Sequence, residues 1–193
     1  MNKEWQIVIA GSGGQGLMLA GNILSWTATQ KEDRNATQRN FYGPEKRGGY
    51  ASTEVKISDE EIIFPNVEEA DVIILLHQAA ANEYAGRVTE NMTVIYDSTE
   101  VDISVLKEKP KHCYGIPMTD MIRSIHAVQS LNIMALGALC RLTGVVKEEN
   151  MLALVCESFP KNTELNTKAF KMGAESIEQA MPAAEQGRVS NGF

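Results

Sequence analysis

The sequence predicts an α/β fold, with an open, mostly parallel β-sheet, helices on both faces and a β-hairpin excursion near residues 50–65. A short apolar run, Ile7–Ala10, leads into a glycine loop and then into a segment with helical apolar periodicity. Two further apolar runs, Asp71–His77 and Met92–Asp97, are typical of buried parallel strands. Strict alternation over Ala51–Ile57 indicates the excursion. This order of elements is Rossmann-like.

Length and composition bound the protein class. A chain of 193 residues suits one domain over residues 1–193, with a frayed tail at Met181–Phe193. The net charge of −7 argues against a general nucleic-acid-binding surface. The sequence has no apolar run long enough to span a bilayer, and Met1–Trp5 does not resemble a signal peptide. We therefore expect a cytoplasmic protein.

The cysteines and histidines are scattered along the chain. They are Cys113, Cys140 and Cys156, and His77, His112 and His126. The cysteines lack metal-ligand spacing, so we expect reduced thiols and neither an iron–sulfur cluster nor a structural zinc site in this chain. A three-histidine site assembled by the fold stays an open alternative.

The glycine loop has the spacing G-x-G-x-x-G at Gly11, Gly13 and Gly16. Such glycines allow a tight turn, a close approach of a phosphate or another backbone, and strand–helix packing. The helix that follows would direct free N–H groups at a ligand above the loop. A dinucleotide site also needs an acidic residue at the end of the second strand, whereas Glu32 and Asp33 come near its start. Anion or backbone recognition and simple packing both stay open.

A second glycine-rich stretch spans Phe41–Tyr50 and combines Gly-Pro, Gly-Gly, two tyrosines and the cations Lys46 and Arg47. Loops of this kind lie on the surface and often carry function. The two cations suit a phosphate or a carboxylate of a partner. The alternative is a solvated connector.

The first helix should run to about Thr29. The polar stretch Lys31–Arg39 is a poor strand candidate, with only a short extended piece expected at Thr37–Phe41. Ala51–Ile57 should form a half-buried strand, antiparallel or at an edge, and Glu61–Phe64 its hairpin partner.

Asp71–His77 should be a central parallel strand, followed by a helix at Gln78–Gly86. His77 then lies at the carboxyl edge of the sheet, either as a ligand or as a hydrogen-bonding cap. Met92–Asp97 repeats the strand pattern, and Asp97 either binds a ligand or stabilises a turn.

A last short strand is expected at Lys111–Ile116, with a helix starting near Thr119. Asn132–Leu139 is apolar on nearly every side, which predicts a helix buried in the core or against another subunit, with Gly144 ending it. Further helices are predicted at Lys147–Phe159 and Thr163–Gln179.

The sequence contains no complete catalytic set. It has neither a nucleophile elbow nor a Walker loop, and its paired carboxylates fall in turns or at helix starts. A glycine loop and a basic aromatic loop without such a set suggest one subunit of a larger assembly.

These motifs resemble the gamma subunit of the 2-oxoacid:ferredoxin oxidoreductases. The resemblance covers nearly the whole chain and rests on both glycine motifs in order, supported by smaller matches. The matching residues are Gly11–Gly16 with Ala20 and Gly21, Tyr42–Gly49, Asn132 with Ala135–Ala138, and Phe159 with Pro160. The second motif is more similar to the 2-oxoglutarate, branched-chain and pyruvate types than to the indolepyruvate type, and 2-oxoglutarate is favoured.

The resemblance implies a reaction and its partners. A 2-oxoacid is decarboxylated on thiamine diphosphate, electrons pass through iron–sulfur clusters to ferredoxin, and coenzyme A takes the acyl group. Thiamine diphosphate, Mg and the clusters belong to alpha and beta subunits, with a delta subunit as an open alternative. No nucleic acid or membrane is implied. The isolated gamma chain would be inactive, with no catalytic or metal-ligating residue.

Our site hypothesis is that the two glycine motifs contact coenzyme A or clamp a partner subunit. The candidate residues are Gly11, Ser12, Gly13, Gly14, Gln15, Gly16, Tyr42, Gly43, Lys46, Arg47, Gly48 and Gly49. A stand-alone Rossmann-type nucleotide-binding oxidoreductase and a purely structural assembly subunit are the two alternatives.

Overall fold

The computed structural model describes residues 4–43 and 49–182. In these residues a six-stranded sheet has the order β2-β3-β1-β4-β5-β6. Its strands are β1 Glu4–Ser12, β2 Asn35–Tyr42, β3 Tyr50–Ser58, β4 Val72–Leu75, β5 Thr93–Asp97 and β6 His112–Ile116. The helices are α1 Leu17–Trp26, α2 Gln78–Tyr84, α3 Met118–Ser124, α4 Leu131–Thr143, α5 Glu148–Ser158 and α6 Thr163–Ala180, with short turns η1 Thr27–Lys31, η2 Ile103–Val105 and η3 Val128–Ser130.

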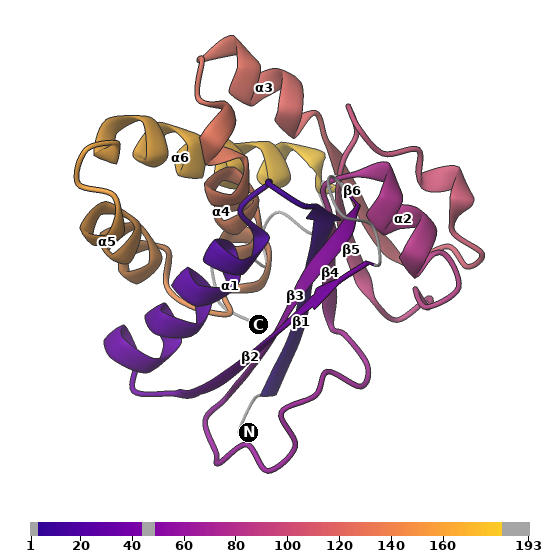
Figure 1. The fold of residues 1–193 in the computed structure, drawn as a ribbon, viewed down its shortest axis with the longest axis horizontal. Coiled ribbons are helices and arrows are strands. Elements are labelled where there is room, and N and C mark those ends of the chain that lie inside the picture. The colour runs from indigo at the N-terminus through magenta and orange to yellow at the C-terminus, as the bar shows by residue number, and fades with distance from the viewer. Residues whose placement is uncertain (1–3, 44–48, 183–193) are drawn as a thin grey trace.

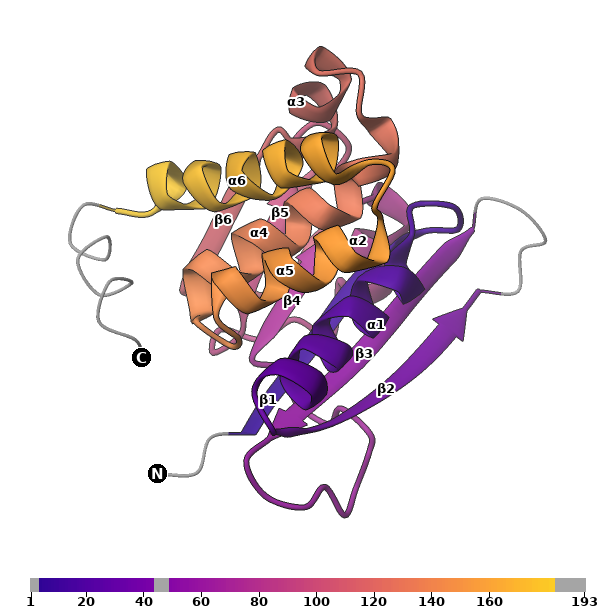
Figure 2. The same ribbon diagram turned by 90° about the vertical axis from the view of Figure 1, so that its left-hand side faces the viewer.

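Helices cover both faces of the sheet, as predicted. Figures 1 and 2 show α1, α4, α5 and α6 on one face and α2 on the other. Alternate residues of β1 divide between the two cores: Ile7 and Ile9 pack under the four helices, whereas Val8 and Ala10 pack under α2. This division is what the period-two alternation of a strand produces when both faces are buried.

The parallel part of the sheet confirms the strands expected from continuous apolar runs. β4 pairs in parallel with both β1 and β5, and β5 pairs in parallel with β6. All four residues of β4 are buried, which explains why its sequence shows no alternation.

The antiparallel part differs from the expectation. β3 is antiparallel, as predicted, but it is not an edge strand, because it pairs with β1 on one side and β2 on the other. It is therefore buried on both faces rather than half-buried. The residues Glu61–Phe64 form no strand, so the predicted hairpin near residues 50–65 is wrong in place; the hairpin is β2–β3.

The prediction that the polar stretch Lys31–Arg39 forms only a short extended piece is also wrong. Its second half belongs to β2, a full strand of eight residues. It lies at the edge of the sheet and its side chains are exposed or half-buried, so it needs no apolar pattern. The first helix likewise does not simply end near Thr29; α1 passes into a π-helical turn that extends to Lys31.

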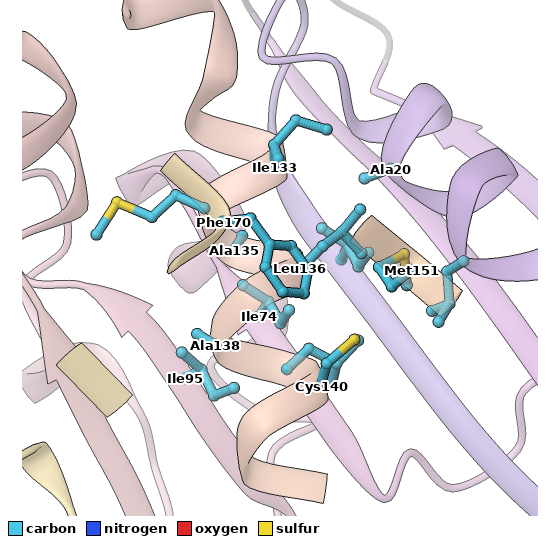
Figure 3. Close-up of a cluster of buried hydrophobic side chains, with 14 of the residues drawn as sticks. Ala20, Ile74, Ile95, Ile133, Ala135, Leu136, Ala138, Cys140, Met151 and Phe170 are labelled. Carbon is cyan, nitrogen blue, oxygen red and sulfur yellow. The ribbon is translucent and has the colours of Figure 1, made fainter. Parts of the chain in front are cut away.

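Helix α4 is the centre of the larger core, as its all-round apolar sequence predicted. Every residue of α4 except Arg141 is buried within this chain. Figure 3 shows part of the layer, with Leu136, Ala138 and Phe170 near Ile74 and Ile95 of the sheet. Gly144 ends the helix in the left-handed conformation at φ 60°, as expected.

The remaining elements agree with the predicted order of strands and helices. β6, α3, α5 and α6 lie within one or two residues of their expected positions. Among residues 4–43 and 49–182, none of the helices combines the length and apolar character that crossing a bilayer requires. Residues 183–193 lie outside the described part of the chain, so the frayed tail and the single domain over residues 1–193 stay predictions.

Candidate functional site

The glycine loop connects β1 to α1 at the carboxyl edge of the parallel strands. Gly14 and Gly16 have φ angles of 101° and 72°, a conformation that side chains with a Cβ rarely adopt. Gly16 is also the residue that caps the start of α1. Gly11 acts differently from expectation: its φ is not positive, and an added Cβ would overlap with the side-chain oxygen of Gln15. It is required for close packing rather than for the bend.

Gln15 fixes the loop from within. Its Oε1 accepts a hydrogen bond from the Ser12 backbone N–H at 2.7 Å. Its Nε2 donates to the carbonyl of Leu76 at 3.0 Å, just beyond the end of β4. The oxygen and the nitrogen of this one side-chain amide therefore link the loop after β1 to the end of the neighbouring strand β4.

Asn132 fixes the loop from outside. It lies in the first turn of α4, only 2% exposed, and its Nδ2 donates to the carbonyl of Gly16 at 3.1 Å. The Gly16 carbonyl also accepts the Ala20 N–H at 3.0 Å, the first bond of α1. The first amides of a helix have no partner inside the helix, so α1 presents donors and its positive dipole end at this edge.

The structure brings the two glycine motifs together. The Gly13 N–H of the first motif donates to the Gly49 carbonyl of the second at 3.0 Å. Within the second stretch, the Gly43 N–H donates to the Tyr50 carbonyl at 2.7 Å. The Tyr42 hydroxyl contacts the Met18 sulfur on α1, and its side chain is 62% exposed. Lys46, Arg47 and Gly48 lie outside the described residues.

A groove of about 480 Å³ borders the glycine loop. One wall consists of Gly14, Gln15 and Gly16, three members of the predicted site. The opposite wall comes from the turn after β5, from α3, from η3 and from the first turn of α4. Its lining residues include Glu100, Thr119, Arg123, Val128, Gln129 and Asn132. Tyr42, Gly43 and Gly49 are not among the lining residues.

Arg123 gives this groove a cation opposite the start of α1. Its side chain is 57% exposed and lies 3.3 Å from Glu100 and 3.5 Å from Asp120. Glu100 lines the same groove, but exposed ion pairs of this kind are weak, so an anion can compete with it for the guanidinium. Helix amides and an arginine together form an environment that suits a phosphate or a carboxylate.

Asp97 holds the far wall in place. It is fully buried, and its Oδ2 accepts hydrogen bonds from the N–H and hydroxyl of Thr119, while Oδ1 accepts the Thr99 N–H at 3.1 Å. Burial raises the pKa of this carboxyl, and these hydrogen bonds oppose the rise. Of the two interpretations from sequence, the structure favours turn stabilisation by Asp97 over ligand binding.

His77 caps the start of helix α2. Its Nδ1 accepts the Ala79 N–H at 3.2 Å.

Sequence reasoning missed the far wall of the groove. Glu100, Arg123 and Gln129 carry no motif, and they come from a part of the chain distant from the glycine loop. The signal that could have found them is positional, because Glu100 and Thr119 follow the carboxyl ends of β5 and β6, where open α/β sheets bind ligands.

The described residues contain no group of three or more histidine, cysteine or acidic side chains placed to hold a metal ion. The three cysteines are free thiols, and burial raises the pKa of Cys140 well above its usual value.

Comparison with known proteins gives a consistent result. The profile of the family described as pyruvate ferredoxin/flavodoxin oxidoreductase matches residues 6–176. The 2-oxoglutarate synthase subunit KorC of Methanocaldococcus jannaschii is 40% identical over 181 residues, which cover 93% of this chain and 96% of that protein.

Two solved structures share the fold. The gamma subunit of a keto/oxoacid ferredoxin oxidoreductase from Geobacter sulfurreducens is 33% identical with a TM-score of 0.79, covering 92% of this chain and 98% of that one. The 2-oxoglutarate:ferredoxin oxidoreductase of Magnetococcus marinus, solved with 2-oxoglutarate, coenzyme A and succinyl-CoA bound, is 22% identical with a TM-score of 0.83. It covers 94% of this chain and 32% of that one, and at this identity the likeness concerns the fold alone.

Proposed function

This chain belongs to the pyruvate ferredoxin/flavodoxin oxidoreductase family as a gamma-type subunit, and from this premise we propose that it serves a thiamine-dependent 2-oxoacid:ferredoxin oxidoreductase with 2-oxoglutarate as the favoured substrate. In that reaction the 2-oxoacid loses carbon dioxide, its acyl group passes to the coenzyme A thiol, and two electrons pass to ferredoxin. The preference for 2-oxoglutarate rests on the relative that is 40% identical and named for that substrate.

The redox cofactors would be held elsewhere in the complex. The described residues offer no metal-binding group, and the free cysteines do not cluster. We propose that thiamine diphosphate, Mg and the iron–sulfur clusters reside on alpha and beta subunits, or on a delta subunit. We further expect the complex to act in the cytoplasm and the isolated gamma chain to be inactive.

The groove beside the glycine loop is the observation that carries a role for this chain. It combines the start of α1, which follows a loop fixed by Gln15 and Asn132, with the exposed cation of Arg123. A pyrophosphate matches that set of donors, and coenzyme A is the component of the reaction that carries one. We therefore assign the groove to the approach of coenzyme A, with Lys46 and Arg47 of the adjoining motif as further anion-binding candidates.

The experiment is steady-state kinetics on the assembled enzyme with Arg123→Ala and Arg47→Ala, each compared with Lys161→Ala, which removes an exposed cation elsewhere. We expect both arginine variants to raise KM for coenzyme A while KM for the 2-oxoacid and the affinity between subunits stay constant. If both arginine variants leave the coenzyme A KM unchanged, the coenzyme A role is withdrawn.

A clamp on a partner subunit is the second candidate role for the same motifs. The exposed Tyr42 beside Met18, on the surface next to the glycine loop, favours it. Under this role the variants of Arg47 and Tyr42 would weaken subunit association without changing the coenzyme A KM.

Dinucleotide binding by the isolated chain is disfavoured by the topology. In the dinucleotide fold the strand beside β1 is parallel to it and carries the ribose-binding acid at its carboxyl end. Here the neighbour on that side is the antiparallel β3, whose amino end, Tyr50, lies opposite Ser12. Titration of the isolated chain with NAD would show no binding.

A further inference from the structure

Residues 59–70, nearly all of the segment between β3 and β4, form a loop with no helix or strand. Figures 1 and 2 show it extending past the end of the sheet near the start of β1. Ile63 and Phe64 lie next to each other in this loop and are 78% and 71% exposed. They are the two most exposed large apolar side chains in the described part of the chain.

The backbone of this loop is fixed by side chains of the sheet. Alternate residues of β2, which lie on one face, each bind it, and β1 and β3 add further bonds. From β2, the Asn35 side chain donates to the Glu60 carbonyl at 3.0 Å, Thr37 donates to the Pro65 carbonyl at 3.4 Å, and Arg39 donates to the Asn66 side chain. From β1, the Gln6 side chain accepts the Glu68 N–H at 2.8 Å. From β3, Glu54 is hydrogen bonded to the Val67 backbone.

This anchoring has two consequences. The loop covers the part of the sheet face that the short helix α2 does not reach, which explains the polar side chains of β2. It also holds Ile63 and Phe64 outside the core that they would otherwise help to form. Long ordered loops with exposed apolar side chains are typical of binding segments.

The negative charge of the loop indicates which kind of surface would be complementary to it. Residues 59–70 include five acidic residues and no lysine or arginine. Glu61, Glu68 and Glu69 of the same loop are exposed. A complementary surface is an apolar hollow with a lysine- or arginine-rich rim, and an anionic lipid surface would repel the loop.

A second copy of this chain does not match that description. The copy has the same net charge of −7. Its groove between α4, α5 and α6 contains Arg141 and Lys171, but three glutamates line the same groove. Self-association through the loop is therefore opposed by like charges.

We propose that the loop at residues 59–70 docks onto another subunit of the same oxidoreductase, inserting Ile63 and Phe64 into an apolar hollow with a basic rim. The inference rests on the proposed function. Glu4 at the start of β1 pairs with Ser58, whereas Ser12 at its end pairs with Tyr50, so the loop and the glycine motifs lie at opposite ends of the sheet. Docking through the loop leaves the groove beside the glycine loop open.

The test is the affinity of the tagged full-length chain for the remaining subunits of its own complex, purified from the native cell. The Ile63→Ser/Phe64→Ser variant should bind at least about tenfold more weakly, because each side chain would lose its burial. Leu165→Ser, which removes a 41% exposed apolar side chain on α6, should bind like the parent. Glu68→Lys/Glu69→Lys should also weaken binding, and the parent's affinity should fall with salt.

The outcomes separate this inference from the proposed function. If the parent chain binds the subunits and the double serine variant binds equally well, the docking role is overturned and the function stands. If the parent chain binds no such subunit, both are overturned. If loop substitutions instead dissociate a homodimer, the occupant is a second copy and the proposal is wrong. Unchanged circular dichroism and thermal unfolding would verify that the variants fold.

Discussion

The Gly13 N–H donates to the Gly49 carbonyl across 3.0 Å, so two glycine motifs that are separate in sequence share one edge of the sheet. The bond follows from the topology, because β3 lies antiparallel beside β1 and starts where β1 ends. The two motifs are therefore neighbours at this edge, although only Gly14, Gln15 and Gly16 of the first motif line the groove. A substitution in one motif should therefore disturb the other, and the packing around each residue determines how much its substitution lowers the free energy of unfolding.

Gly11→Ala should lower the free energy of unfolding by about 1–3 kcal/mol, because a Cβ at this position displaces the Gln15 amide and breaks its bonds to Ser12 and Leu76. Urea denaturation measures the change. Gln15→Ala removes the same bonds without the overlap. The double variant should therefore cost less than the sum of the two single changes. Strict additivity would contradict the Gln15 mechanism.

Gly137→Ala should destabilise the protein by about 3 kcal/mol or more. The added Cβ would overlap with the carbonyl oxygen of Phe170, where α4 crosses α6, and a backbone atom cannot move aside without separating the helices. The gain in helix propensity, about 1 kcal/mol, is smaller. Lys168→Ala, an exposed change on α6, should fall within about 0.5 kcal/mol of the parent. Equal stability of the two variants in thermal or urea unfolding would show that the crossing tolerates a methyl group.

Much of the fold could be predicted because the central strand β4 and nearly all of helix α4 are buried. Continuous apolar runs leave few alternatives, and Val72–Leu75 and Asn132–Leu139 behaved accordingly. The edge strand β2 could not be predicted in this way. Its outward residues Asn35, Thr37 and Arg39 bind the loop at residues 59–70, so their polarity reflects a contact between distant segments. Conversely, the apolar residues Ile63 and Phe64 indicated a strand, but both side chains are exposed in a loop.

The candidate site could be predicted only on one side. The spacing of Gly11, Gly13 and Gly16 locates the loop, in which Gly16 and the neighbouring Gly14 have a backbone conformation that favours glycine. Arg123 and Thr119 line the groove because the strand order brings the segment after β6 to the same edge of the sheet, and a local motif does not encode that order. Asp97 illustrates the same limit: its position after a strand indicated the sheet edge, whereas its burial and its bonds to Thr119 required the fold.

Asp97 should give a specific pH dependence of stability. Burial raises the pKa of this carboxyl in the folded state, so the folded chain holds the proton more tightly than the unfolded chain does. The resulting stabilisation is complete below the ordinary value of 3.8 and is lost as pH rises through the raised pKa. The unfolding free energy of the parent minus that of Asp97→Asn should therefore fall across this acidic window and stay level above it. Urea denaturation at a series of pH values measures the difference, in which the other carboxyls cancel. A difference that rises with pH would contradict this sign.

Asn132→Ala should affect both stability and the proposed coenzyme A groove. It removes a buried hydrogen bond to the Gly16 carbonyl, which should cost about 1–3 kcal/mol and loosen the start of α1. In the assembled enzyme the coenzyme A KM should rise because the amides of the glycine loop are no longer held in place. Asn132→Asp should be worse still, since it places a carboxylate against a carbonyl oxygen.

Asn166→Ala is the matched control for Asn132→Ala. Asn166 is also buried, 5% exposed, and accepts a hydrogen bond from Ser130 at 2.6 Å, but it does not line the groove. Its loss should lower stability by a similar amount and leave the coenzyme A KM unchanged. A parallel rise in KM for both variants would mean that general loosening, and not the Asn132–Gly16 bond, controls coenzyme A binding. An unchanged KM for both would place coenzyme A elsewhere in the complex.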